Sequence, residues 1–385
     1  MAQTIKPLHA VYNFKYNYIR VYGGFFNSET LHNNFKDKTT LFEYLSKYKK
    51  YQTKFGLKLK FDCAEEADDL YGNLKTLGSE QILEWIREYQ ILVELPSDSI
   101  VFLTNDLRAK ENTPDEFKDM VEVYCKYHYF NAPCIDSHML DNRDIKKKFY
   151  IPLSRQSVAR RWMYEFIKSN KSIQNNSYWS WNKRDGDGYL LDAHRNDEVY
   201  AMERYYTSGH EHMDTYHFAG HLLQTHSFCN VIMETYFEND GISEFTNKME
   251  IRNERFFTEK TYRPLSMCQP FIFGGNSNML HYLHNWGFKT FSDYWDESYD
   301  LIDNDEDRMA EIQNLILKLN EKSLEEIQSM YLDMIPILQH NYNNLKKLDR
   351  FSEFQNSMNF NVTEGYEFSM DRYDLEINNK IVKTI

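Results

Sequence analysis

The chain has 385 residues, of which 42% are hydrophobic and 16% aromatic, and it carries a formal net charge of −13. Single hydrophobic cores stop growing at about 250–300 residues, so this length predicts two domains, and the aromatic content excludes a largely disordered chain. The five cysteines form no CxxC pair, which argues against a disulfide scaffold and a four-cysteine zinc site and indicates a reducing compartment. No apolar run approaches the ~18 residues of a membrane helix, so we expect a cytoplasmic protein without a membrane partner.

Short apolar runs alternate along the chain with longer periodic segments, a pattern typical of an α/β fold. In chain order, strands are predicted at Leu57–Phe61, Ile100–Leu103, Phe149–Leu153, Val231–Glu234, Pro270–Phe273 and Lys289–Phe291. Helices are predicted at Thr39–Tyr51, Ser79–Val93, Gln156–Ser169, Thr258–Met267, Ser277–Trp286, Glu306–Asn320 and Leu324–Leu348. In the helix at 277–286, Ser277 is expected to cap the N-terminus and Gly287 to adopt the left-handed conformation after the C-terminus.

The polar stretch Asp136–Lys148 is the candidate linker between two domains. It predicts an N-terminal domain over residues 1–148 and a second domain over 149–330, followed by a helical extension over 331–385. We expect the long C-terminal helices to pack back across the junction between the domains.

Basic residues are concentrated at the start of the chain, where residues 1–60 hold eleven Lys and Arg against three Asp and Glu, a net charge of +8. Aromatic side chains such as Tyr16 and Tyr51 are interleaved with these lysines. Lysines that track phosphates and rings that stack on bases are typical of a nucleic-acid surface. A solvated, lysine-rich helix face above an aromatic core is the simpler alternative.

The most informative segment is Phe256-Phe257-Thr258-Glu259-Lys260, at the start of a predicted helix. Thr258 can cap that helix, and its free first-turn amides together with Lys260 favour an anion, which makes both residues donor-binding candidates. Glu259 can accept hydrogen bonds from ribose hydroxyls, and the preceding aromatic rings can stack on a base. The combination suits a nucleotide-sugar site at the carboxyl ends of strands in an open sheet. An ordinary capped helix, with Glu259 stabilised by the helix dipole, is the alternative.

The run FTEKTYRP at 257–264 is followed by QPFI at 269–272, GFKTF at 287–291 and DESYD at 296–300. It resembles the donor-binding motif of α1,3-fucosyltransferase-type glycosyltransferases and of related viral and bacterial (phage-type) enzymes, over roughly residues 149–310. The resemblance implies the GT-B architecture, in which two Rossmann-like domains face a cleft. It also implies an acceptor-binding N-terminal domain, a C-terminal domain that binds a nucleotide-diphosphate sugar without a metal, and, for a viral protein, the host cytoplasm.

Position by position, the resemblance implies that Glu259 binds the ribose, Lys260 the diphosphate and Phe256 the base. Glu234 resembles the glutamate of the family's FEN motif and is a further donor-binding candidate. The chain departs from the family there, because Thr235 replaces the asparagine. Glu234 and Glu259 are also 25 residues apart, which is more than in the fucosyltransferases. The identity of the base is therefore left open.

Upstream, the segment IPLSR at 151–155 is followed by Arg160 and Arg161 on a predicted helix. This order resembles the strand, turn and arginine-bearing helix of the family, in which an arginine binds the β-phosphate. Bidentate guanidinium geometry suits a leaving diphosphate whose charge grows in the transition state. Arg160 is the first candidate for this role and Arg161 the second, and either can instead be a surface arginine.

A transferase that inverts the anomeric centre needs a general base beside the acceptor hydroxyl, which the two-domain arrangement assigns to the N-terminal domain. Asp106 is the preferred candidate, because it closely follows the predicted strand Ile100–Leu103, and Asp62 is the second. Most aspartates at strand ends cap helices instead, and whether the reaction inverts or retains is left open.

Three other patterns can be read as metal sites. Six histidines cluster within residues 194–226, and His217 and His221 have the i, i+4 spacing of metal ligands, although a structural or surface role is simpler. The DGD run at 185–187 matches a DxD motif but reads first as a turn. Residues 303–307 lack the glycine of a calcium loop and predict an acidic helix N-terminus. We therefore predict no metal.

Together these features predict a nucleotide-sugar-dependent hexosyl- or pentosyltransferase that uses the nucleotide-diphosphate sugar as co-substrate. Two acceptor classes stay open, a modified base in (phage) DNA, indicated by residues 1–60, and a surface or secreted glycan. Two alternatives come from other classes: a non-catalytic binding protein that keeps the transferase fold, and a metal hydrolase built on the histidines.

Overall fold

The computed structural model divides the chain into two compact units, Met1–Tyr124 with Arg350–Ile385, and Cys125–Asp349. Each unit contains one β-sheet with four parallel strands, which confirms the predicted α/β fold class. Among the described helices, none is both long and apolar enough to cross a membrane. The residues that the structure describes are 9–13, 17–22, 28–63, 70–123, 140, 142–153, 157–184, 190–195, 223–234, 237, 255–348 and 361–362.

The sheet of the first unit has the strand order β11-β1-β2-β3-β4-β5, with β2 to β5 parallel and β1 antiparallel to both neighbours. Its strands are β1 (His9–Asn13), β2 (Tyr18–Tyr22), β3 (Lys58–Asp62), β4 (Ile100–Thr104), β5 (Val121–Val123) and β11 (Asn361–Val362). The connecting helices are α1 (Ser28–Asn34), α2 (Lys38–Phe55), α3 (Leu70–Thr76), α4 (Gln81–Leu92), α5 (Ala109–Asn112) and the 3-10 helix η1 (Asp115–Met120). Because the parallel strands follow chain order, right-handed connections place these helices on one face.

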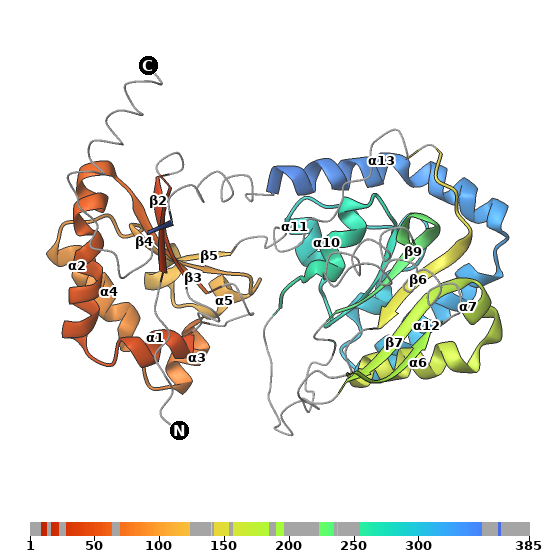
Figure 1. Cartoon of the computed structure of the whole chain (residues 1–385), viewed down its shortest axis with the longest axis horizontal. Helices are drawn as coiled ribbons and strands as arrows, with labels where there is room; N and C mark the ends of the chain where they lie inside the picture. The colour runs from red at the N-terminus through yellow and green to blue at the C-terminus, as the bar shows by residue number, and fades with distance from the viewer. Residues whose placement is uncertain are drawn as a thin grey trace, which may run out of the picture. The chain divides into compact units, whose positions relative to one another are not determined.

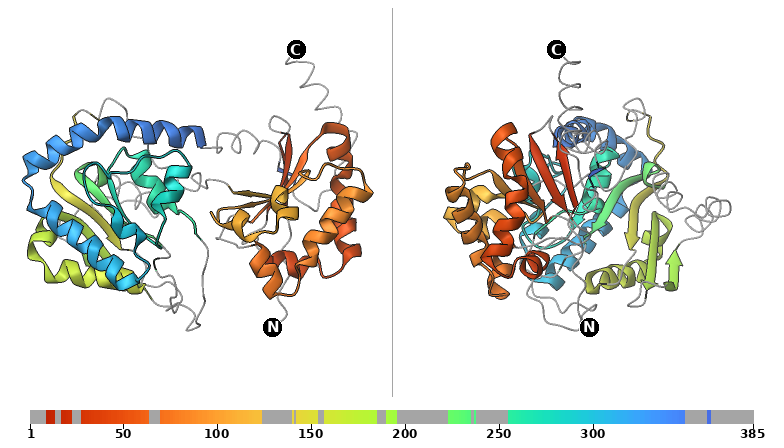
Figure 2. Two further views of the ribbon diagram at one scale, coloured as in Figure 1. Left: turned by 180° about the vertical axis from the view of Figure 1, so that it is seen from behind. Right: turned by 60° about the vertical axis from the view of Figure 1, so that its left-hand side comes forward.

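That face carries the hydrophobic core of the first unit. Leu59 and Phe61 of β3 and Phe102 of β4 belong to one buried cluster with side chains of α1 to α4. The rings of Phe61 and Phe102 stack with their centroids 5.2 Å apart. Helix α2 begins after the cap residue Asp37 and ends before the cap residue Gly56, whose φ of 65° is left-handed. In Figure 2 the red and orange helices α1 to α4 lie to one side of the strands of this unit.

The opposite face of this sheet is polar, because Lys58, Lys60 and Asp62 alternate with the core residues of β3. Four basic side chains from the first sixty residues form ion pairs with carboxylates, and three of these cations lie on this face. The pairs are Arg20–Asp62, Lys38–Glu88, Lys58–Asp98 and Lys60–Glu122. Residues 1–124 together hold 16 Lys and Arg and 19 Asp and Glu, so the basic segment folds into a unit that is not basic overall.

The sheet of the second unit has the order β10-β9-β6-β7-β8, with parallel pairing from β10 to β7 and an antiparallel edge strand β8. Its strands are β6 (Lys147–Leu153), β7 (Ser177–Arg184), β8 (Leu190–Arg195), β9 (Ser227–Met233) and β10 (Phe271–Gly274). The chain passes from β6 to β7 on one side, whereas β9 lies on the other side of β6 and is followed outward by β10. The strand order therefore reverses between β6 and β9, and right-handed connections place their helices on opposite faces.

Helices accordingly cover both faces of this second sheet (Figure 1). Helices α6 (Val158–Ser169) and α7 (Lys171–Asn175) connect β6 to β7, and α12 (Asp305–Glu321) packs beside them. Helix α10 (Glu259–Ser266) leads into β10, and α13 (Leu324–Leu348) packs on α10, β6 and β9. Helix α13 thus packs on the sheet of its own unit, whereas the chain returns to the first unit as strand β11 beside β1.

Five of the six predicted strands and all seven predicted helices are present, with ends shifted by a few residues. The predicted strand Lys289–Phe291 is wrong, because a side chain rather than a neighbouring strand binds its backbone. The amide of Lys289 donates to Oδ1 of Asn341 in α13, and Nδ2 of Asn341 donates to the carbonyl of Lys289, both at 2.8 Å.

The helix predicted at 277–286 begins later than expected, as α11 (Leu280–Asn285). Ser277 does not cap it, because its hydroxyl donates to the carboxylate of Asp303 at 2.8 Å. Gly287 after its C-terminus has the expected left-handed conformation, with a φ of 80°.

The division between the units differs from the predicted domain limits. The candidate linker Asp136–Lys148 belongs entirely to the second unit, and strand β6 begins within it at Lys147. The structure divides the chain after Tyr124, and it groups residues 331–348 with the second unit through α13.

Candidate functional site

The reversal of strand order between β6 and β9 brings two helix N-termini to the same edge of the second sheet. Helix α6 starts shortly after the carboxyl end of β6, where the Ser157 hydroxyl accepts the amide of Arg160 at 3.2 Å. Glu234 directly follows β9 and binds the first turn of α10. In open α/β sheets, ligands bind outside the carboxyl ends of the strands at such a reversal, so we take this edge as the candidate site.

Glu234 joins the end of β9 to the start of α10. It is 3% exposed, and its carboxylate accepts three hydrogen bonds from described residues at the start of α10. The amide of Thr258 donates to Oε1 at 3.0 Å, and the hydroxyls of Thr258 and Thr261 donate to Oε2 and Oε1, each at 2.5 Å. Thr261 is a partner that sequence analysis missed, and the one signal for it is its position one helical turn after Thr258.

Thr258 is the N-cap of α10, as predicted. Its Oγ1 accepts the backbone amide of Lys260 at 3.3 Å and the Lys260 ammonium at 3.2 Å. The amide of Thr261 donates to the Thr258 carbonyl at 3.1 Å. The expectation that this turn offers free amides to an anion is therefore wrong for residues 258, 260 and 261, and attraction for an anion has to come mainly from side chains.

Arg160 is 3% exposed and lies beneath the site rather than on its surface. Its Nε and Nη2 donate to the carbonyl of Met233 at 3.3 and 2.9 Å, and Nη2 also donates to the carbonyl of Glu234 at 3.0 Å. The guanidinium thus ties the first turn of α6 to the carboxyl end of β9. The neighbouring Arg161 is exposed.

The two aromatic residues before Thr258 have different environments. Phe257 is 2% exposed and makes edge contacts with the rings of Phe273 and Trp286, at centroid distances of 5.9 and 5.7 Å. Phe256 is half-buried, so it is the ring that a base can reach. Glu259 is the first residue of α10, and its side chain lies outside the described part of the structure.

The GFKTF and DESYD segments support the sheet from its edge. The carboxylate of Glu297 accepts the Thr290 hydroxyl at 2.6 Å and the Phe291 amide at 2.9 Å. The hydroxyl of Tyr299 accepts the amide of Phe273 in β10 at 3.1 Å. These two segments thus form a scaffold for β10.

Asp300 caps α11 from within this scaffold and is 3% exposed. Its carboxylate accepts the amides of Met279 at 3.1 Å and Leu280 at 3.0 Å. Burial is the main reason that its pKa rises from 3.8 to about 6.

This raised pKa predicts a pH dependence of stability. Native Asp300 binds its proton more tightly than the unfolded chain, so its contribution is fully present below about pH 4 and is lost as the pH rises through 6. Between pH 5 and 8 we expect the wild-type free energy of unfolding to fall by about 1–2 kcal/mol relative to Asp300→Asn. Urea titrations followed by tryptophan fluorescence measure this difference, and parallel pH profiles for the two proteins would contradict it.

Asp106, the predicted general base, is fully buried at the carboxyl end of β4. Its Oδ1 accepts the amide of Arg108 at 3.1 Å, and its carbonyl accepts the amide of Ala109 in α5 at 3.2 Å. Both contacts lie in the turn between β4 and α5, in which Arg108 is the N-cap residue. The second candidate, Asp62, is ion-paired with Arg20.

Within the described part of the chain, no group of three His, Cys, Asp or Glu side chains is placed to bind a metal ion. Four of the six clustered histidines and the DGD run lie outside the described residues. Asn304 caps α12 by accepting the amide of Asp307 at 3.0 Å, so residues 303–307 form the predicted acidic helix N-terminus.

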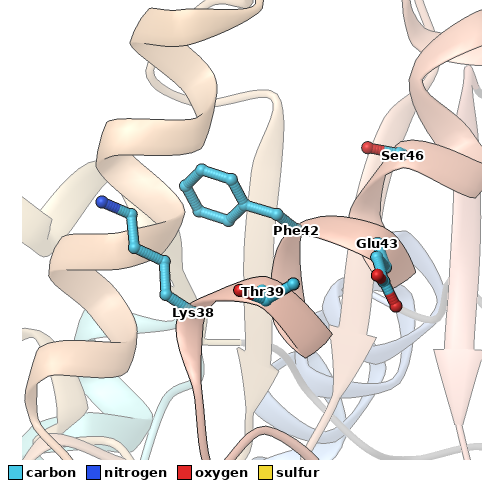
Figure 3. A pocket seen from close by; sticks show the side chains of 5 residues that line it. All are labelled: Lys38, Thr39, Phe42, Glu43 and Ser46. Carbon is cyan, nitrogen blue, oxygen red and sulfur yellow. The ribbon is translucent and has the colours of Figure 1, made fainter.

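A hollow of about 510 Å³ lies on α2 of the first unit, lined by Lys38, Thr39, Phe42, Glu43 and Ser46 (Figure 3). Lys38 is ion-paired with Glu88 of α4 and lies 5.4 Å from the centroid of the Phe42 ring. The hollow contains none of the predicted site residues.

The chain matches no protein-family model, and no curated protein or solved structure is found to match it. A functional proposal therefore rests on the geometry between β6 and β9 and on the residues of the turn before α10.

Proposed function

We propose that the protein is a glycosyltransferase of GT-B architecture whose second unit binds a nucleotide-diphosphate sugar. One observation carries the proposal: the first turns of α6 and α10 are joined through Glu234 where the strand order reverses between β6 and β9. This is the ligand position of open α/β sheets. The turn Thr258-Glu259-Lys260 at this position is also the part of the chain that resembles the donor-binding motif of the fucosyltransferase family.

Four side chains contact the donor in this proposal. Lys260 and the exposed Arg161 bind the diphosphate, Glu259 accepts the ribose hydroxyls, and the half-buried Phe256 packs on the base. Positive charge from side chains is required because protein acceptors already occupy three amides of the α10 turn. A lysine and a guanidinium provide that charge and form charge-assisted hydrogen bonds to phosphate oxygens.

Arg160 and Glu234 have a supporting role in this proposal. Both are buried, and the described contacts direct their polar atoms to protein groups at the ends of β9 and α10. They hold the two helix N-termini together beneath the position of the diphosphate, so their effect on the donor passes through their neighbours.

Lys260 and Arg161 also contribute to the chemical step in this proposal. Glycosyl transfer breaks the bond between the anomeric carbon and a diphosphate oxygen, and negative charge grows on the leaving diphosphate. Cations that are already in position stabilise this charge in the transition state. Lys260 and Arg161 supply that stabilisation here, and the proposal includes no metal.

For the acceptor, the charges of the first unit favour a glycan over a modified base in DNA. Binding to a DNA backbone needs basic side chains that can neutralise phosphates. Among the described basic residues of 1–60, four are ion-paired with carboxylates, and residues 1–124 hold more acidic than basic side chains. The exposed lysines near the end of α2, such as Lys50 and Lys54, also complement the negative end of that helix.

The proposal is tested by calorimetric titration with UDP-, GDP- and dTDP-sugars, followed by an assay for release of free sugar. We expect one donor to bind and to be hydrolysed slowly, because bound donors react with water when the acceptor is absent. Binding without hydrolysis would favour the non-catalytic binding protein. No binding of any of the three donors would contradict the proposed function.

A further inference from the structure

The hydroxyl of Thr258 links the buried carboxylate of Glu234 to the ammonium of Lys260. Its Oγ1 lies 2.5 Å from Oε2 of Glu234, 3.2 Å from Nζ of Lys260 and 3.3 Å from the Lys260 amide. A threonine hydroxyl has one hydrogen and two acceptor lone pairs. In this arrangement the hydrogen goes to the carboxylate, and the lone pairs are directed to Lys260.

We propose that Glu234 is a positioning residue for Lys260 that acts through Thr258 and does not itself contact the donor. The carboxylate fixes the rotation of the Thr258 hydroxyl, and the hydroxyl oxygen then holds the lysine ammonium at the start of α10. The described contacts point both carboxylate oxygens at protein donors, and the side chain is 3% exposed. This inference rests on the proposed function, because it assigns Lys260 to the diphosphate.

The hydrogen bond between the Thr258 hydroxyl and Glu234 is expected to be strong because the carboxylate is buried. A charged acceptor strengthens a hydrogen bond, and leaving a buried carboxylate short of donors is costly, so the Thr258 hydroxyl has little freedom to turn away from Glu234. Arg160 restrains the link from the other side by binding the carbonyls of Met233 and Glu234. The orientation of Lys260 is thereby coupled to β9, although the lysine belongs to α10.

The chain offers a matched pair of substitutions that separates positioning from general stability. Thr258→Val and Thr261→Val each remove one hydroxyl that donates to Glu234 at 2.5 Å, and each replaces threonine by a residue of the same shape. The Thr258 hydroxyl also contacts the Lys260 ammonium, whereas in the described part of the chain the Thr261 hydroxyl contacts Glu234 and not Lys260. Thr258→Ser keeps the hydroxyl and serves as the conservative rescue.

The first measurement needs no ligand. The rate at which acetic anhydride labels the Lys260 amine is read by mass spectrometry in the full-length protein. We expect the rate to rise at least threefold in Thr258→Val and to stay within 1.5-fold of wild type in Thr261→Val and Thr258→Ser. Equal changes in the two valine variants, or none in either, would overturn the inference whether or not a nucleotide binds.

The second measurement uses UDP and GDP as probes. We expect Thr258→Val to weaken binding of the tighter-binding nucleotide about 10-fold and Thr261→Val to change that affinity less than 2-fold. In a protein that already carries Lys260→Ala, Thr258→Val is expected to cause no further loss of affinity. Additive losses in the double variant would overturn the link. If wild-type protein binds neither probe, the proposed function fails, while the labelling rates still decide whether Thr258 positions Lys260.

A third comparison tests whether Glu234 itself contacts the donor. UDP or GDP is compared with its 2′-deoxy analogue in wild type and in Glu234→Gln. The ratio of the two affinities is expected to be the same in both proteins, within about twofold. A ratio that changes more than that would assign Glu234 to the ribose and overturn the positioning role.

Discussion

Replacing Lys260 with alanine is expected to weaken binding of a nucleoside diphosphate by about 10- to 100-fold. Hydrogen bonds to charged groups contribute about 1.5–3 kcal/mol, and each 1.4 kcal/mol corresponds to a tenfold change in affinity. The lysine lies at the first turn of α10, and its ammonium is bonded to Thr258, not buried in the core. The variant is therefore expected to keep its fold, and calorimetric titration with UDP and GDP measures the loss.

Two controls test whether the loss of affinity in Lys260→Ala is specific to the diphosphate. Lys318→Ala removes the same charge from an exposed position on α12 of the same unit, and its nucleotide affinity is expected to match wild type. The corresponding nucleosides lack the diphosphate, so their weak binding should not differ between Lys260→Ala and wild type. Equal losses for nucleoside and nucleotide would indicate local unfolding of the turn, and an unchanged affinity for the nucleotide would remove Lys260 from the proposed site.

The start of α10 was predictable from sequence because its determinants are local. An N-cap threonine bonds to an amide two residues later, and this preference depends on the cap residue and its nearest neighbours. The left-handed Gly287 is likewise a local choice, since glycine adopts positive φ without a steric penalty. Features of this kind allowed the helix and its cap residue to be placed without tertiary information.

The environment of each site residue depends on partners that are distant in the chain. Arg160 bonds to backbone groups 73 and 74 residues later, and Glu234 bonds to residues 24 and 27 positions away. The sequence does not tell whether an arginine on the first turn of a helix points outward to a ligand or downward to a strand end. The strand predicted at 289–291 failed for a similar reason, because its backbone partner is Asn341 of α13.

The charged residues of the first unit likewise depend on partners that are distant in the chain. Within residues 1–60 the sequence predicts a basic surface, because that segment contains only three acidic residues beside its eleven Lys and Arg. The carboxylates that neutralise Lys58 and Lys60 come 40 and 62 residues later, from the loop before β4 and from β5. The fold of one parallel sheet, whose strands are separated along the chain by helices, brings these charges together. A local charge count therefore does not predict the charge of the folded surface.

The largest expected effect on stability comes from Arg160→Met. Methionine keeps much of the side-chain volume but removes the guanidinium, which leaves the carbonyls of Met233 and Glu234 without these donors in a buried position. Each buried polar group left without a partner costs about 1–3 kcal/mol, so the free energy of unfolding should fall by about 2–4 kcal/mol. Five of the six tryptophans lie in the second unit, so urea unfolding followed by tryptophan fluorescence reports on it.

Arg161→Met is the matched control for this prediction, because it changes the next residue of the same helix at an exposed position. It is expected to alter the free energy of unfolding by less than about 1 kcal/mol but to weaken nucleotide binding, since Arg161 is proposed to bind the diphosphate. Measuring stability and nucleotide affinity on both variants separates the two roles. If Arg160→Met were as stable as wild type and lost nucleotide binding, Arg160 would reach the phosphate, and the guanidinium would have to leave the end of β9 when the donor binds.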